Sequence, residues 1–156
     1  MSQKKIYRPN VAFIVLSEDY PQRKDIFIAE RSDIKDVWQF PQGGIDKGES
    51  AEDALFREME EEIGTKDAKI IAEYPEWISY DFPTHVARKM NPYAGQKQRY
   101  FLVQLNKTAK INLATKVPEF SAYKFVDYSE LSEYIAHFKR PIYEKVLEHF
   151  KEEGYF

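Results

Sequence analysis

The segment from Ser50 to Gly64 constrains the fold more than any other part of the chain, because it specifies a helix with both ends defined. Ser50, with Asp53 three residues later, predicts a capped N-terminus, and a glycine such as Gly64 is typical of the residue that ends a helix. At 100° per residue, one arc of this helix is apolar and holds Leu55, Met59 and Ile63. The stripe predicts that the helix packs on a sheet.

The arc beside this stripe carries three carboxylates, those of Glu58, Glu61 and Glu62. They span roughly 100° of helix surface and converge on one point at the edge of the core. Glu58 and Glu62 repel each other at i,i+4 spacing, and all three lie toward the helix end where the dipole favours cations. One interpretation is a solvated acidic face. The other is a bound hard cation, since carboxylate oxygens are ligands that Mg²⁺ and Mn²⁺ prefer.

The composition restricts any metal site to oxygen ligands. The chain has no cysteine, which excludes disulfides, thiolate metal sites and a cysteine nucleophile. Its three histidines are scattered, which argues against a histidine-based zinc site. The net charge of −3 is uneven, because residues 43–65 carry eight acidic against two basic residues and the remainder is net basic. Such a pattern suits a polyanionic substrate that arrives with divalent cations.

The remaining pattern predicts a mixed α/β fold in a single domain, residues 1–156, since 156 residues are too few for two ordinary domains. Apolar, β-branched runs predict strands at residues 6–16, 25–30, 37–41, 70–80, 98–105 and 123–126, the first two forming a hairpin-like pair. A turn is expected at Gln42–Gly44. Ser129 is expected to cap a short helix to Tyr134, and a last helix should run from Pro141 to about Glu153.

Two further features bear on location and binding. Residues 1–10 contain no apolar stretch of signal-peptide length, and the apolar run 11–16 is too short to cross a membrane. We therefore expect a cytoplasmic protein with no membrane partner. The segments 82–97 and 106–121 are longer than usual connections and are expected to be binding or mobile loops.

The spacing around the acidic helix has a family resemblance. From Gly43 the chain reads glycine, five residues, Glu49, seven residues, Arg57-Glu58-Met59, one residue, Glu61-Glu62, one residue and Gly64. This closely resembles the Nudix box, a loop–helix–loop motif, with Thr65 as a departure where the family usually has a larger aliphatic residue. The resemblance implies a Nudix-type α/β/α sandwich with a mixed central sheet. It also implies hydrolysis of a phosphoanhydride bond with Mg²⁺, or with Mn²⁺ or another divalent cation.

The same resemblance assigns roles within the box. It implies that Glu58, Glu61 and Glu62 are metal ligands, or ligands plus a general base, with a carbonyl of Gln42 or Gly43 as a further candidate ligand. Glu49 and Arg57 are assigned to an internal ion pair that holds the loop against the helix. Gly43 and Gly44 would allow a tight turn and a close backbone approach.

The segments flanking the box narrow the expected substrate. Together they resemble the bacterial RNA pyrophosphohydrolases over nearly the whole chain, at residues 7–11, 38–45, 95–98, 118–120 and 138–140. This subfamily removes pyrophosphate from the 5′-triphosphate end of RNA, which leaves a 5′-monophosphate and starts mRNA decay. It shades into asymmetric dinucleoside tetraphosphate hydrolases, which give ATP and AMP and share a segment like Tyr80–Pro83. The noncatalytic Nudix binding module is the third alternative, and the three intact box glutamates argue against it.

The subfamily resemblance also supplies candidate contacts outside the box. Glu119 would be an additional metal ligand, and the general base stays open between Glu61 and Glu119. Tyr80 is expected either to contact substrate or to complete a strand. Aromatic and cationic side chains commonly bind single-stranded ends, so candidates for stacking and phosphate contacts are Phe138, Arg8, Arg31, Lys97 and Lys139. The sequence pI near 5.7 argues against tight nonspecific binding and favours contact with only the first one or two nucleotides.

Overall fold

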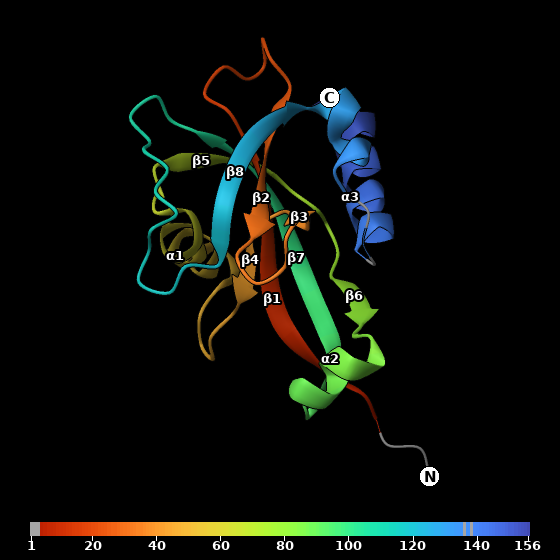
Figure 1. Cartoon of the computed structure of the whole chain (residues 1–156). Helices are drawn as coiled ribbons and strands as arrows, with labels where there is room; N and C mark the ends of the chain where they lie inside the picture. The colour runs from red at the N-terminus through yellow and green to blue at the C-terminus, as the bar shows by residue number, and fades with distance from the viewer. Residues whose placement is uncertain (1–3, 136, 138) are drawn as a thin grey trace.

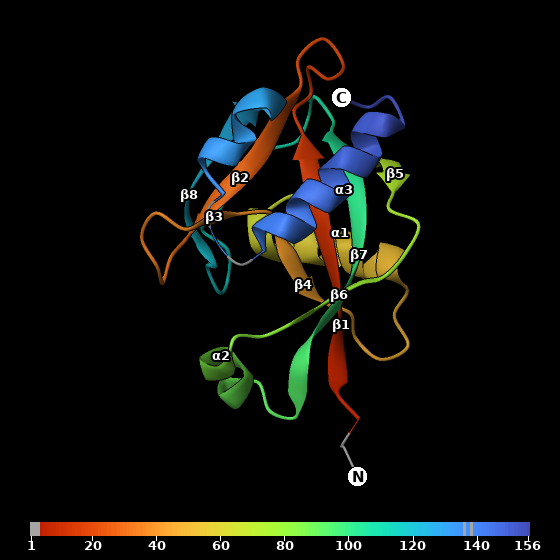
Figure 2. The same cartoon turned by 90° about the vertical axis from the view of Figure 1, so that its right-hand side faces the viewer.

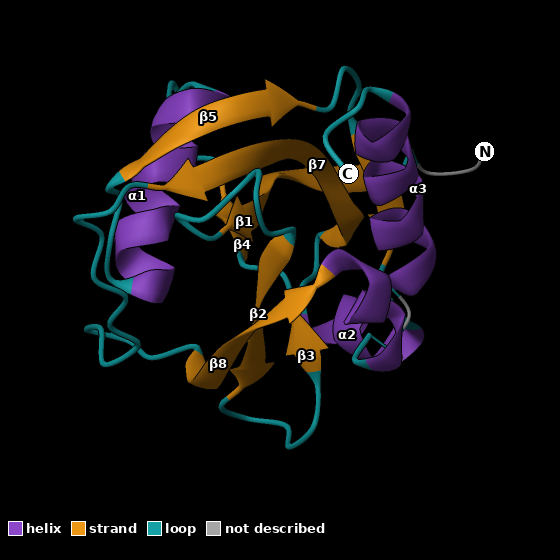
Figure 3. Ribbon diagram, turned by 90° about the horizontal axis from the view of Figure 1, so that it is seen from above, coloured by secondary structure: helices purple, strands orange, loops and turns teal. Residues whose placement is uncertain are grey.

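The computed structural model describes residues 4–135, 137 and 139–156. Within these residues, one mixed sheet of eight strands lies between helices α1 and α3, as Figures 1 and 3 show. The predicted α/β/α sandwich with a mixed central sheet is confirmed. No helix in the described part of the chain is long and apolar enough to cross a membrane.

Four strands precede the first helix, and two pairs of strands separate the later helices, with most of the helical residues in α1 and α3. Their bounds are β1 (Ile6–Leu16), β2 (Asp25–Arg31), β3 (Trp38–Gln39), β4 (Gln42–Gly44), α1 (Ala51–Ile63), β5 (Ala68–Glu73), β6 (Ile78–Asp81), α2 (Thr84–Lys89), β7 (Tyr93–Leu105), β8 (Phe120–Asp127), the 3-10 helix η1 (Tyr128–Glu133) and α3 (Arg140–Glu152).

The sheet is organised around β1 and β7, which pair in parallel from Tyr7 opposite Gly95 to Leu16 opposite Gln104. The main strand order is β3-β2-β1-β7-β5, and β4, β6 and β8 pair with β1, β7 and β2. All of these other pairings are antiparallel. The long β1–β7 pair is therefore the support on which the shorter strands and the helices are placed.

β1 is apolar on both faces because it lies in the centre of the sheet. Successive side chains of a strand point to opposite faces, so Val11, Phe13 and Val15 join the core beneath α1, with Leu55 and Met59. The alternate residues of β1 join a second core beneath α3, with Tyr143, Val146, Leu147 and Phe150. Each fully buried side chain of this size contributes about 1.5–3 kcal/mol relative to exposure. Burial on both faces thus fixes α1 and α3 on opposite sides of the sheet.

Both ends of α1 match the sequence prediction. The Ser50 side chain accepts a hydrogen bond from the Asp53 amide at 3.0 Å. Gly64 ends the helix at φ 78°, and its amide donates to the Glu60 carbonyl. The loop after β7 returns to this end, where the Asn112 amide donates to the Ile63 carbonyl at 2.9 Å. One backbone amide at the start of α1 and one carbonyl at its end thereby gain partners outside the helix.

Several predicted boundaries were wrong where tertiary pairing overrides local pattern. The predicted strand at residues 70–80 is two strands, β5 and β6, separated by a stretch containing Pro75, which cannot donate a ladder hydrogen bond. β1 and β2 pair only where Leu16 faces Ile26, because β7 and β4 take the two edges of β1 over its middle. The predicted loop at residues 82–97 contains α2 and the beginning of β7.

Two smaller differences concern turns and caps. Gln42–Gly44 was expected to be a turn but is the short strand β4, which pairs with residues 10–12 of β1. Asp127, and not Ser129, caps the short helix, since its carboxylate accepts from the Ser129 amide at 2.9 Å. The last helix is confirmed, with Pro141 in its first turn.

We expect Gly64→Ala to destabilise the protein more than Gly48→Ala, although both glycines have a positive φ, 78° and 81°. The left-handed conformation alone costs a non-glycine residue about 1–2 kcal/mol. At Gly64 a Cβ would also overlap the Asn112 carbonyl oxygen, whereas at Gly48 it would meet no atom within 4 Å. Urea denaturation followed by circular dichroism measures both losses, and equal losses would contradict the proposed packing of Asn112 on Gly64.

Candidate metal-binding and catalytic site

A polar cavity of about 330 Å³ opens where β1, β4 and the C-terminal half of α1 meet. Its lining is mixed in charge. The carboxylates are those of Glu58, Glu61, Glu62 and Glu119, and the cations are Arg8, Arg31 and Lys139. Amide side chains of Asn10, Gln39, Gln42 and Gln96 complete the polar lining. Segments far apart in the sequence thus supply one site.

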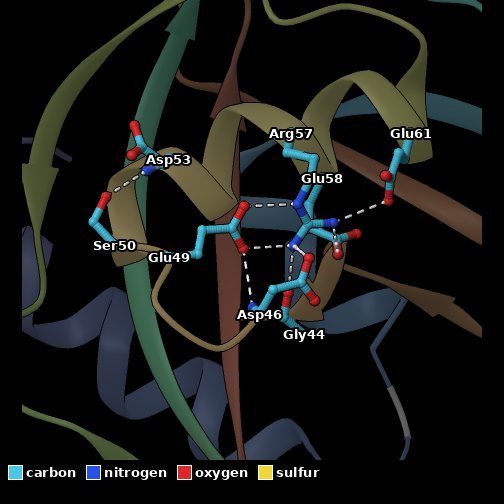
Figure 4. Close-up of polar contacts among 8 residues, drawn as sticks. All are labelled: Gly44, Asp46, Glu49, Ser50, Asp53, Arg57, Glu58 and Glu61. Atoms are coloured by element: carbon cyan, nitrogen blue, oxygen red, sulfur yellow. Dashed lines mark hydrogen bonds and ion pairs between the residues drawn. The ribbon is translucent and has the colours of Figure 1, made fainter.

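The Arg57 guanidinium joins the segments that carry the acidic part of this cavity (Figure 4). It donates two hydrogen bonds of 2.8 Å to the Glu49 carboxylate, and a third of 2.8 Å to the Gly44 carbonyl of β4. The same group contacts Glu58 at 2.9 Å and Glu61 at 3.2 Å. Arg57 therefore fixes the loop before α1, the strand β4 and two of the glutamates relative to one another.

Glu49 is held firmly in its charged form. The hydrogen bonds from Arg57, followed by that from the Asp46 amide, lower the pKa of Glu49 to about 2. The Asp46 amide donates to the Glu49 carboxylate at 3.0 Å, so this side chain also closes the loop on itself. The structure thus places Glu49 and Arg57 in the ion pair that the sequence predicted for them.

The glycines of β4 allow two charged side chains to approach its backbone. A Cβ at Gly43 would overlap the Glu58 carboxylate, and a Cβ at Gly44 would overlap the Arg8 guanidinium. Neither glycine has a positive φ, so the requirement is for space and not for an unusual backbone conformation. Gly43 and Gly44 therefore bring an anionic and a cationic side chain to neighbouring positions of one strand.

Burial and mutual repulsion destabilise the charged forms of Glu58 and Glu62. Glu58 is 6% exposed, and burial raises its pKa although Arg57 opposes the shift. Burial, together with the nearby Glu119, Glu58 and Glu61, raises the pKa of Glu62 to about 9. Its Oε2 atom is buried and has no hydrogen-bond partner in the described part of the chain. Such an oxygen is costly to bury unless a cation or a donor satisfies it.

These oxygen donors fit a hard divalent cation. A cation would offset the mutual repulsion and satisfy the orphaned Glu62 oxygen. Within the described residues, no three acidic or histidine side chains already stand as a complete set of ligands. Arg57 holds an oxygen of Glu58 and an oxygen of Glu61. Glu61 is 58% exposed, and an ion pair at such exposure is worth at most about 1 kcal/mol, so its carboxylate can turn toward Glu58 and Glu62 at small cost.

A buried amide network forms the part of the cavity nearest the core. Gln98 donates to Asn10 and to Gln42 at 2.8 Å each, and Tyr100 donates to Gln98 at 2.8 Å. The Lys139 ammonium donates to the same Gln42 oxygen at 3.0 Å. Burial, with a smaller contribution from Arg31, lowers the pKa of Lys139 to about 8. The network therefore holds one cation at the cavity whose charge is lost in mildly alkaline solution.

His137 connects the segment before α3 to β3. Its Nε2 lies 2.9 Å from the Trp38 carbonyl, which can only accept, so Nε2 carries the proton. Its Nδ1 accepts from the Lys139 amide at 3.3 Å. Burial lowers the pKa of His137, in keeping with a neutral ring that uses both nitrogens. This connection positions Lys139 beside Gln42.

The structure does not bring every predicted residue to the cavity. The Lys97 ammonium lies 5.0 Å from the centre of the Trp77 ring and does not line the cavity. Phe138 lies outside the described residues. Tyr80 lies beside the cavity lining, where burial raises its pKa to about 12 and a hydrogen bond with Gln42 opposes the shift. Glu119 is exposed, directly before β8, and its carbonyl accepts from the Ser32 amide at 2.9 Å.

Sequence reasoning gave no site role to the amides of Asn10, Gln96 and Gln98, or to His137. Asn10 and Gln98 are almost fully buried and face each other across β1 and β7. The available signal was an amide at an inward position of an otherwise apolar strand, because such a group is buried only when it is hydrogen-bonded. For His137 the local sequence holds no comparable signal.

Comparison with known proteins agrees with this geometry. The family model described as NUDIX domain matches residues 6–146. The RNA pyrophosphohydrolase of a Nitratiruptor species is 64% identical over 154 residues, 99% of this chain and 99% of that protein. The RNA pyrophosphohydrolase of Campylobacter jejuni subsp. doylei is 61% identical over 155 residues, again 99% of each. A C. elegans Ap4A hydrolase in a binary complex matches with TM-score 0.69 and 16% identity over 94% of this chain and 98% of that one, a similarity of fold.

We expect Glu62→Gln to stabilise the metal-free protein by about 1 kcal/mol, because it replaces a half-buried carboxylate, whose Oε2 has no hydrogen-bond partner among the described residues, by a neutral amide of similar shape. The corresponding rise in Tm is about 2–4 °C. Since the pKa of Glu62 is raised from 4.5 to about 9, the gain should be absent below the lower value and grow as pH rises through this range. Adding Mg²⁺ should raise the Tm of the wild type and not that of the variant.

Thermal denaturation in EDTA and in Mg²⁺ measures both effects. Glu60→Gln is the matched control, since Glu60 is exposed on the same helix and its carboxylate lies 3.5 Å from the ammonium of the exposed Lys66. A lower Tm for Glu62→Gln in EDTA, or an equal response of both variants to Mg²⁺, would contradict the assignment of Glu62.

Proposed function

The chain belongs to the Nudix family of hydrolases, and on that premise we propose that it removes pyrophosphate from the 5′-triphosphate end of RNA. The observation that carries the proposal is the convergence of four carboxylates and three cations on one cavity, with a buried oxygen of Glu62 that has no hydrogen-bond partner among the described residues. The cations of the lining suit the phosphates of a triphosphate, and its carboxylates suit the divalent cations that accompany them. The high identity to proteins named RNA pyrophosphohydrolase supports RNA as the substrate.

The proposed reaction consumes one water molecule. A water oxygen forms a bond to phosphorus, the phosphoanhydride bond breaks, and the products are a 5′-monophosphate end and free pyrophosphate. Divalent cations, Mg²⁺ in this proposal, would neutralise the triphosphate and acidify a bound water. Glu58, Glu61, Glu62 and Glu119 would hold them. The monophosphate product is the form from which we propose that mRNA decay starts.

The proton of the attacking water requires a carboxylate base. Glu61 and Glu119 are the two exposed members of the cluster, and both line the cavity. Glu58 is 6% exposed, and Glu62 is held at the core edge by burial, whereas Glu61 is exposed although it also contacts Arg57. We therefore assign the base to Glu61 or Glu119 and a ligand role to Glu58 and Glu62.

The phosphates of the substrate would meet three cations at the cavity. Arg8 lies against the Gly44 backbone. Arg31 is oriented by Asp33 through hydrogen bonds of 2.8 and 2.5 Å. Lys139 projects from the segment before α3 and is fixed by Gln42. An arginine guanidinium can donate two hydrogen bonds to one phosphate, and a lysine ammonium adds a positive charge, so together these groups can bind several consecutive phosphates.

A dinucleoside tetraphosphate is the second candidate substrate. It presents a comparable run of phosphates to the same three cations, and the fold matches that of an Ap4A hydrolase. Asymmetric cleavage would give ATP and AMP. The two candidates differ in the products and in whether an RNA chain follows the first nucleotides.

A competition assay tests the proposal. In the presence of Mg²⁺, we expect a higher kcat/KM for a short 5′-triphosphate RNA than for diadenosine tetraphosphate, with pyrophosphate and a 5′-monophosphate RNA as products. Glu62→Gln should lower kcat by roughly 10²-fold or more while still binding the RNA, because it removes a carboxylate ligand. Glu60→Gln should retain the wild-type rate. A preference for the dinucleotide would favour the second candidate, and no turnover of either substrate would refute both.

The pH dependence tests Lys139. In the free enzyme its ammonium loses its charge as pH rises through about 8, so its attraction for phosphate should be lost over the same range. We expect the ratio of kcat/KM for wild type to that for Lys139→Met to be large below pH 8 and to approach one well above it. Lys139→Arg should keep an advantage over Lys139→Met at alkaline pH. A ratio independent of pH would show that Lys139 does not bind phosphate as a cation.

A further inference from the structure

The short helix α2 is a basic element that contributes no residue to the core. None of its residues is buried, and His85, Arg88 and Lys89 are exposed. Within the described residues, none of these three forms an ion pair with a carboxylate. Packing therefore does not account for this group of cations.

The helix α2 lies near the catalytic cavity, although none of its residues lines that cavity. The helix follows directly after β6, whose Tyr80 ring lies 6.0 Å from the Lys139 ammonium and packs edge-on against Phe82. Figures 2 and 3 show α2 on the same side of the β1–β7 pair as the loop between β2 and β3. That loop carries Asp33, whose pKa is lowered first by Arg31 and also by the charge of Lys89. The charge of Lys89 in α2 thus acts on Asp33, the residue that orients Arg31.

The charges around the cavity favour one direction for a long polyanion. The other side of the glutamates opens into a second cavity, whose charged lining is one ammonium, that of Lys116, and four carboxylates, those of Glu60, Glu61, Glu62 and Glu119. The phosphates of an RNA chain would be repelled there in the absence of counterions. On the α2 side they would meet exposed cations instead. Single-stranded nucleic acids are commonly drawn along such cationic surfaces.

We propose that α2 binds the RNA chain beyond its 5′ end, with Arg88 and Lys89 contacting backbone phosphates of nucleotides outside the cavity. The inference rests on the proposed function, since it concerns how the same site selects RNA. A dinucleoside tetraphosphate has no such chain and gains nothing from α2. The helix is therefore a specificity element that favours RNA over dinucleotides.

Arg88 and Lys89 also lie in the last turn of α2, where positive charges stabilise a helix by interacting with its dipole. A purely structural role predicts that their loss affects every substrate equally, through the shape of the cavity edge. A role in binding the RNA chain predicts an effect that depends on substrate length and on salt. The two roles can therefore be separated by experiment.

The test variant is the double substitution Arg88→Gln and Lys89→Gln, which removes the charges and keeps good helix formers. Its substrates are a 5′-triphosphate trinucleotide, an unstructured 5′-triphosphate RNA of about twelve nucleotides, and diadenosine tetraphosphate. We expect kcat/KM for the long RNA to fall about ten-fold at about 50 mM salt and to approach wild type near 200 mM, because losing two phosphate contacts reduces the salt slope by about 1.4. The trinucleotide and the dinucleotide should stay within about two-fold of wild type.

The matched control is Lys145→Gln with Lys151→Gln, which removes the same charge from the exposed face of α3. It should leave all three substrates unchanged. Equal losses on all substrates, no loss on the long RNA, or the same loss in the control would each overturn the proposal. If the wild type hydrolyses only the dinucleotide, the proposed function fails; fluorescence anisotropy with a labelled 5′-triphosphate RNA of the same length then tests α2 alone, and equal affinity of wild type and variant would overturn it.

Discussion

The arrangement of the site depends on the guanidinium of Arg57. It reaches the loop before α1 through Glu49, the strand β4 through the Gly44 carbonyl, and the carboxylate cluster through Glu58 and Glu61. Each hydrogen bond to a charged partner is worth about 1.5–3 kcal/mol when it is shielded from water. Arg57 is 28% exposed, so the sum is smaller than the individual values suggest. Even so, this one group joins the strand, the loop and the helix that carry the acidic part of the cavity.

The carboxylate cluster has a cost that the rest of the fold must offset. Glu58 and Glu62 repel each other, lie near the helix end that disfavours anions, and are partly removed from water. The two apolar cores on either side of β1 supply the stability that tolerates this arrangement. A site that is unfavourable by itself and favourable with divalent cations is consistent with metal-dependent hydrolysis. The carboxylates of α1 that would bind the metal therefore lower the stability of the metal-free protein.

The cationic side of the cavity has a different origin. Its cations come from β1, from β2 and from the segment before α3. Asp33 orients Arg31, Arg8 lies against Gly44, and Gln42 and His137 position Lys139. The carboxylates come from one helix turn and one loop. Substitutions in the strands and loops can thus change which phosphate-containing substrate binds, while the carboxylates of α1 stay the same.

The resemblance to the Nudix box implied the pairing of Glu49 with Arg57. The sequence by itself determined the local features, namely the limits of α1 and the clustering of Glu58, Glu61 and Glu62. These follow from helical periodicity, caps and short spacings, which act over a few residues. Only the tertiary structure decided that Gln98 faces Asn10, that His137 positions Lys139, and that Lys97 lies over Trp77 and away from the cavity. Those contacts join residues far apart in the chain, and their geometry depends on strand register and on which edge of β1 each strand takes. No local pattern encodes that register, because it results from the packing of the whole sheet between two helices.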